Sequence, residues 1–330
     1  PVLLLSLLTF GLSFNRYVIT PSVGVNAYLV ILIGFLIAIF SLFVIKSLAV
    51  KYPDQTIIHM GNKLLGPLGK IGAPVWLIII FLLTALLTRR VTDEVATIIL
   101  FRTPRFVTTL AFLLIAGYMA SLGEEALGRL SSALMIMVPL FLMLLLISYR
   151  QVNFLNIHPV NIHRDLGYLK KWDLWLLIFT PVWVFGAFYG NESLRNNFKG
   201  IILTITGGAL ILGATYLAVA GAFGPKGNIR YEWPVMSLMN ITELAPNYLF
   251  QNFITTFFFL VFLSFALVNV AGFIIVISKG FSEFLGARDS RSKLILLLII
   301  TALFILTAST TLINYKETAD PVLKVGGFYT

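Results

Sequence analysis

Two stretches of the sequence place helix-breaking residues among small polar and aromatic side chains, as a ligand site inside a membrane would need. The first has Gly11 among threonine and serine, and the second has Pro181 and Gly186 among aromatic residues. Proline removes a backbone donor and glycine relaxes the backbone, so both stretches predict an interrupted helix. The free N–H groups of an interruption can hold a carboxylate, and its free carbonyls can face an ammonium group or a cation. Close helix packing is the alternative role for the glycines.

The pocket that these stretches predict takes side chains from three apolar segments, which are the first, sixth and eighth along the chain. Its residues are Thr9, Phe10, Gly11 and Ser13, then Phe185, Gly186, Phe188 and Tyr189, and finally Ser264 and Asn269. The aromatic rings could shield the side chain of a ligand, although contact with lipid or helix packing is the alternative for a residue type as common as phenylalanine. Ser264 and Asn269, in the interior of the eighth segment, could line the pocket or form hydrogen bonds between helices.

Charged residues near these stretches have other interpretations. Glu192 is the ionisable residue closest to the second interruption, and it is either a proton site or a solvated loop residue. Five more charged residues are expected at helix ends or paired with one another: Arg16, Arg89, Arg90, Asp93 and Glu94.

The sequence gives little support to catalysis or metal binding. The chain has no cysteine, which excludes disulfides, thiolate ligands and cysteine nucleophiles. It also lacks the H-E-x-x-H, G-x-S-x-G and Walker A patterns. His158 and His163 flank a proline with one aspartate nearby, which is too few ligands to favour a metal site. We therefore predict a protein that is not an enzyme and has no cofactor or metal.

The composition is that of an integral membrane protein. Of the 330 residues, 58% are hydrophobic and 12% are charged, whereas soluble domains contain about a quarter charged residues. The formal net charge of +10 comes from basic residues in the short gaps between apolar runs, where they help set topology and contact anionic lipid. These gaps do not form a separate basic domain, so we predict no binding to nucleic acid.

The apolar runs predict about nine transmembrane helices in a single domain covering residues 1–330. The expected spans are 1–20, 26–50, 71–101, 106–122, 128–148, 174–190, 199–222, 250–278 and 292–313, with a truncated tenth from about Pro321. Gly11 and Gly186 lie about 175 residues apart, and the segments that follow them keep nearly the same offset. This spacing predicts an all-α, ten-helix inverted-repeat (5+5) transporter fold with discontinuous helices 1 and 6. Repeat one covers about 1–150 and repeat two about 173–330.

Short proline- and glycine-containing motifs occur along nearly the whole chain. They are YPDQTII at 52–58, LLGPLGK at 64–70, RTP at 102–104, EALGRL at 125–130, VPLF at 138–141, FGP at 223–225 and WP at 233–234. In these motifs the chain resembles the B subunits of spore germinant receptors, a family similar to the amino acid–polyamine–cation permeases. The sequence departs from that family after Gly190, where polar residues replace the apolar second half of segment six.

The resemblance implies a subunit in the inner membrane of a bacterial endospore, with its N-terminus inside. Such a subunit binds a nutrient germinant, often an amino acid, and acts with an A subunit and a lipoprotein C subunit. Two alternatives stay open, an ion-coupled amino-acid permease and a scaffold subunit that binds no ligand. Segment five has no lysine between Leu130 and Ser148, so the lysine proton switch of some permease relatives is not available.

Overall fold

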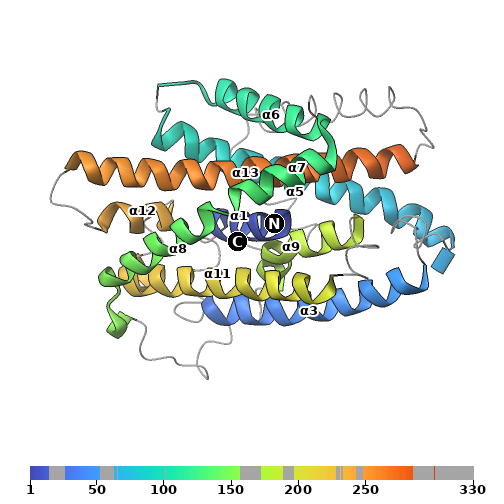
Figure 1. Cartoon of the computed structure of the whole chain (residues 1–330), viewed down its shortest axis with the longest axis horizontal. Coiled ribbons are helices and arrows are strands. Elements are labelled where there is room, and N and C mark those ends of the chain that lie inside the picture. The colour runs from blue at the N-terminus through green and yellow to red at the C-terminus, as the bar shows by residue number, and fades with distance from the viewer. Residues whose placement is uncertain are drawn as a thin grey trace.

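The computed structural model is helical wherever it has regular structure among the residues that it describes, which are 1–14, 27–52, 63–64, 66–100, 102–156, 172–188, 197–227, 231, 233–242, 248–284 and 301 (Figure 1). The helices are α1 (Val2–Ser13), α3 (Ala27–Lys51), α5 (Pro67–Ile98), α6 (Arg105–Ser121), α7 (Gly123–Leu134), α8 (Met137–Ser148), α9 (Trp172–Phe188), α11 (Phe198–Gly227), α12 (Pro234–Ile241) and α13 (Tyr248–Phe284), with short 3-10 turns at Tyr149–Gln151 and Phe154–Asn156.

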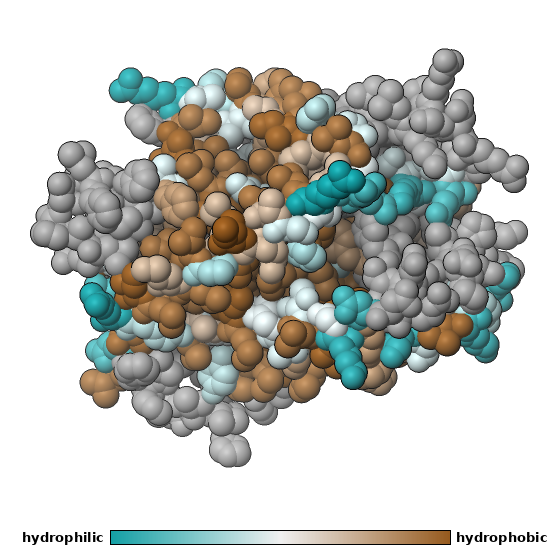
Figure 2. Space-filling view, viewed as in Figure 1, coloured by the Kyte–Doolittle hydropathy of each residue, from teal (hydrophilic) through white to brown (hydrophobic). Residues whose placement is uncertain are grey.

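Four of the described helices are long and apolar enough to cross a membrane. They contain the stretches Tyr28–Lys51, Ile71–Ile98, Phe198–Gly224 and Thr255–Phe284, and the bent pair α6 and α7 would add a fifth. In Figure 2, hydrophobic residues cover the middle of the visible face, and most hydrophilic ones gather toward its two ends. The long helices run along the same axis of the molecule (Figure 1). These features indicate an integral membrane protein.

Most predicted spans correspond to described helices, although only four or five of these are long and apolar enough to cross a membrane. The expected spans 26–50, 71–101, 199–222 and 250–278 agree with α3, α5, α11 and α13. The expected span 128–148 is two helices, because α7 begins at Gly123 and ends before a turn that separates it from α8. Gly123 has φ +87, which allows the chain to bend by 114° between α6 and α7. The expected span 292–313 and the tenth segment fall outside the described residues, except for Thr301.

Two sets of contacts hold the helices together, one centred on α13 and one among α1, α3, α9 and α11. Helix α13 contacts α1, α5, α6 and α7, and it is buried along most of its length. Helices α1, α3, α9 and α11 pack on one another, and α3 exposes Leu32, Leu36 and Phe40 at four-residue spacing on one face. Such a stripe suits contact with lipid. Helix α1 belongs to both sets of contacts and therefore lies at the centre of the structure.

Neither helix is interrupted at the residues that suggested a break. Helix α1 is regular through Gly11 and ends at Ser13, and α9 is helical through Pro181 and Gly186 to Phe188. The prediction that the helix unwinds at Gly11, Pro181 or Gly186 is therefore wrong, although each helix ends within the stretch where a break was expected. The residues that follow, 15–26 and 189–196, lie outside the described part of the chain.

Candidate functional site at the end of helix α1

Helix α1 ends inside the protein. Its 12 residues cover about 18 Å, whereas the hydrocarbon of a bilayer is about 30 Å thick. Every residue from Leu4 to Phe14 is buried. The last carbonyls of a helix have no donor within the helix, so in this setting their partners must come from other parts of the protein.

Two side chains from other helices donate to these carbonyls. The Tyr216 hydroxyl of α11 donates to the Gly11 carbonyl at 2.6 Å, and Nε of Arg90 on α5 donates to the Ser13 carbonyl at 3.2 Å. Tyr216 is completely buried and Arg90 is 4% exposed. The positive guanidinium also lies at the end of the helix where the dipole favours a cation.

Arg90 connects α1 to two further elements. Its guanidinium carbon lies 3.5 Å from the centroid of the Trp233 ring, just before α12 begins, which is the geometry of a cation–π contact. One helical turn beyond Arg90, Glu94 is also 4% exposed, and residues four apart lie on one face of a helix. A buried guanidinium and a buried carboxyl group therefore share one face of α5.

An aromatic cluster brings together two residues of the predicted pocket. The Phe273 ring of α13 lies between Phe10 of α1 and Phe185 of α9, with centroid distances of 5.6 and 5.4 Å. A side chain at Gly272 would collide with the Phe185 ring, since an added Cβ would lie 2.9 Å from its edge. The glycine therefore allows α9 and α13 to approach, and the cluster marks the point where α1, α9 and α13 meet.

The polar residues of the predicted pocket fall into two classes. The hydroxyls of Thr9 and Ser264 donate to carbonyls of their own helices, Leu5 and Leu260, each at 2.8 Å. By contrast, the Ser13 hydroxyl and both amide atoms of Asn269 are buried and have no hydrogen-bond partner among the described residues. Ser13 and Asn269 each lie about one helical turn from the aromatic cluster. They are the predicted site residues with unused hydrogen-bonding capacity.

Gly11 has a packing role. An added Cβ would collide with the Leu212 side chain of α11, so this side of α1 is in close contact with α11. Of the other predicted residues, Gly186 and Phe188 lie in α9, where the structure describes only their backbone. Tyr189 lies outside the described residues. The same holds for Glu192 and for the two histidines, and no group of three potential metal ligands occurs among the described residues.

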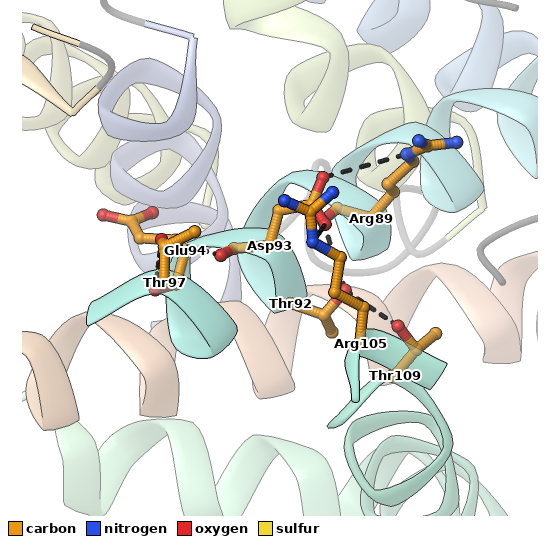
Figure 3. A network of polar contacts seen from close by, with 7 residues as sticks. All are labelled: Arg89, Thr92, Asp93, Glu94, Thr97, Arg105 and Thr109. Carbon is orange, nitrogen blue, oxygen red and sulfur yellow. Dashed lines mark hydrogen bonds and ion pairs between the residues drawn. The ribbon is translucent and has the colours of Figure 1, made fainter. Parts of the chain in front are cut away.

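A second polar group lies on the neighbouring face of α5 (Figure 3). Asp93 forms two ion pairs. Its carboxylate oxygens lie 3.8 Å from Nε of Arg89 and 3.7 Å from Nε of Arg105 on α6. The Thr109 hydroxyl donates to that of Thr92 at 3.1 Å, which adds a further link between α5 and α6. Figure 3 shows Glu94 turned away from Arg105. Of the two expectations, helix ends or pairing with one another, pairing is confirmed for Arg89 and Asp93, and a helix-end position does not hold for Arg90, which lies well inside α5.

Sequence reasoning did not select Arg90, Tyr216, Trp233 or Phe273 for this site. Arg90 carried the only usable signal, since an arginine within a long apolar segment must be compensated by other parts of the protein. The other three are aromatic residues among many, and their positions follow from packing between distant segments. The partner of a carbonyl at the end of α1 is found only once α5 and α11 are placed beside it.

Comparisons with known proteins agree with the resemblance inferred from the motifs. Residues 3–314 match the family described as spore germination protein. The chain is also similar to the spore germination protein YndE of Bacillus subtilis (strain 168), with 24% identity over 250 residues that make up 73% of this chain and 67% of YndE. Because the family match covers nearly the whole sequence, this chain belongs to the spore germination protein family.

Proposed function

We propose that this chain is the B subunit of a nutrient-germinant receptor in the inner membrane of a bacterial endospore. It binds a small germinant, such as an amino acid, where α1, α9 and α13 meet, and it signals through an A subunit and a lipoprotein C subunit. The observation that carries this proposal is the pairing of unpartnered buried polar atoms, on Ser13 and Asn269, with the adjacent aromatic cluster. Membership of the spore germination protein family supports the receptor role.

The chemistry of this site suits an amino acid. A buried polar group without a partner costs roughly 1–3 kcal/mol, which a ligand that supplies the partner recovers. The Asn269 amide offers both a donor and an acceptor, and the Ser13 hydroxyl can do either, so together they can address an ammonium and a carboxylate group. Phe10, Phe185 and Phe273 offer an apolar surface to the remainder of the ligand.

The proposed fold is a ten-helix inverted repeat with discontinuous helices 1 and 6, in one transmembrane domain. It is supported by the packing of α1, α3, α9 and α11, because these are the first two helices of each proposed repeat. The pocket residues are buried, so a ligand enters only when helices move. Ligand binding then shifts a two-state scaffold, and the partner subunits respond to that shift.

A time course of radiolabelled amino-acid retention by proteoliposomes tests the proposal. The panel includes alanine, and retention is measured with and without an imposed ion gradient. A receptor levels off near one ligand per protein regardless of the gradient. Accumulation far beyond that ratio, with collapse when the gradient is removed, would instead identify an ion-coupled permease. Absence of retention for every compound, also with the A and C subunits present, would favour the scaffold alternative.

Variants at two polar residues of the predicted pocket, both on α13, make the test specific. Asn269→Leu removes the unpartnered amide and should abolish retention. Ser264→Ala is the matched control on the same helix, since its hydroxyl is already bonded to the Leu260 carbonyl, and it should retain ligand as the unmodified chain does. Equal retention by both variants would place the ligand elsewhere.

A further inference from the structure

In transporters with discontinuous helices, a dissociable cation is commonly bound at a helix end like the C-terminal end of α1. The dipole of a helix gives this end a partial negative charge, and half-helix ends at membrane depth commonly coordinate sodium ions through their carbonyls. In this chain that end is buried, and it lies beside the proposed germinant pocket. Whether its oxygens fit a cation can be judged from their partners.

The carbonyl oxygens do not fit a dissociable cation. The Ser13 carbonyl accepts from Arg90, and the Gly11 carbonyl accepts from Tyr216 at 2.6 Å. Both donors are themselves buried, so water does not readily replace them. A second positive charge next to the guanidinium would be strongly repelled in a site of low dielectric constant.

The guanidinium is also fixed in place. The Trp233 ring lies against it, with the guanidinium carbon 3.5 Å from the ring centroid. The positive charge is therefore compensated from two sides, by the carbonyl at the end of α1 and by the indole ring. A tethered side chain that satisfies these groups cannot leave the site as a free ion can.

We infer that Arg90 is a tethered cation that takes the place of a dissociable metal cation at the end of α1. The stability of this end is then independent of sodium and potassium. Applied to the germinant site, which rests on the proposed function above, the inference means that ligand binding requires no co-bound monovalent cation. Arg90 is a positioning residue here, because it holds the end of α1 next to the pocket.

The experiment is a thermal melt of the purified full-length chain in detergent, without any germinant, in chloride salts of sodium, potassium or N-methylglucamine at equal ionic strength. The unmodified chain should melt at the same temperature in all three salts. Stabilisation by sodium or potassium over N-methylglucamine would overturn the inference. Because no germinant is present, this outcome is separate from success or failure of the retention assay.

Arg90→Gln sharpens the test because it removes the charge and keeps a hydrogen-bonding group. This variant should melt lower in N-methylglucamine and recover by several degrees in sodium or potassium, as the vacated site takes up a free cation. A folded variant with the same melting temperature in all three salts would show that the guanidinium fills no cation site. If the variant folds only when a small metal cation is present during purification, that requirement is the expected dependence in its strongest form.

Arg89→Gln is the matched control, since it removes the same charge from the adjacent position. Arg89 pairs with Asp93 on the face toward α6 and does not belong to the end of α1. Its melting temperature should be the same in the three salts. A cation dependence of equal size in both variants would assign the effect to net charge and overturn the role of Arg90.

Discussion

The C-terminal third of α5 carries two arginines, each followed four residues later by an acidic residue, in very different surroundings. Arg90 and Glu94 are each 4% exposed and lie on the face toward α1 and α12. Arg89 and Asp93 have side chains that are 12% and 23% exposed, and their face meets α6, where Arg105 is 55% exposed. Both pairs combine an arginine with an acidic residue at i, i+4 spacing, an aspartate in one and a glutamate in the other.

The comparison shows that the surroundings of an arginine and its acidic neighbour determine how much they contribute to the free energy of unfolding. A pair in contact with solvent contributes about 0–1 kcal/mol, because water screens the attraction. Removing one partner of a buried pair costs about 3–5 kcal/mol, because the other charge is left buried without compensation. The buried face of α5 is therefore expected to determine the structure of the α1 end, and the other face only to support it.

The largest effect is expected for Arg90→Leu. This change leaves the Ser13 carbonyl without its donor and Glu94 without the nearby positive charge, so the free energy of unfolding should fall by about 3–5 kcal/mol. Thermal unfolding of the detergent-solubilised protein measures the loss. Arg89→Leu, the matched change on the other face, should cost about 0–1 kcal/mol.

The double variant Arg90→Leu with Glu94→Leu separates lost charge compensation from lost volume. Replacing both members of a buried pair by apolar residues is often close to neutral, so the double variant should regain part of the stability that Arg90→Leu loses. Recovery stays incomplete because the Ser13 carbonyl remains without a donor. No recovery at all would mean that burying Glu94 costs the same with or without Arg90. The two faces of α5 would then not differ in the way proposed.

Gly11→Ala extends the comparison to the packing of α1. An added methyl group would collide with Leu212 of α11, and overpacking of this kind typically costs about 1–3 kcal/mol. Gly207 of α11 is the control, since an added Cβ there meets no atom within 4 Å, and its replacement by alanine should be neutral or slightly stabilising. The measurement is again the melting temperature. A neutral Gly11→Ala would argue against the close approach of α1 and α11.

Tyr216→Phe removes the other donor to the α1 end while keeping the ring. The Gly11 carbonyl would then be buried without this partner, and the expected loss is about 1–2 kcal/mol. Tyr149→Phe is a matched control, because that hydroxyl donates to the Ala214 carbonyl at 2.7 Å in a partly buried setting where water can replace it. Equal losses of stability in the two variants would show that burial at the α1 end does not increase the contribution of this hydrogen bond.

The sequence predicted the long helices well and the site only in part. The apolar runs of α3 and α11 exceed what a soluble core can bury, so their position and type followed from composition alone. Phe10, Ser13, Phe185 and Asn269 are buried in the aromatic cluster or about one helical turn from it, and their role in ligand binding stays a prediction. The first three were selected from the paired stretches with helix-breaking residues, and Asn269 from its place inside a long apolar segment.

What the sequence could not predict depends on contacts between distant segments. Arg89 and Arg90 are adjacent and chemically identical, and nothing local indicates which of them faces α1. Similarly, Gly11 combines the properties of a helix breaker with those of a packing residue, and only the position of Leu212 decides between them. In both cases the open question is which neighbouring helix a residue faces, and tertiary packing determines the answer.

The smallest effect is expected for Asp93→Asn. The change removes the negative charge between Arg89 and Arg105 but keeps an oxygen that can accept hydrogen bonds. Since these side chains are reached by solvent, the loss should be about 0–1 kcal/mol and should shrink further as salt concentration rises. Melting temperatures at low and high potassium chloride measure it. Glu94→Gln, the matched change on the buried face, should cost more and respond less to salt, because protein rather than water surrounds that carboxyl group. If Asp93→Asn proved the more damaging of the two, the link between α5 and α6 would be the stronger determinant of this end of the protein, and the order of the two faces would have to be reversed.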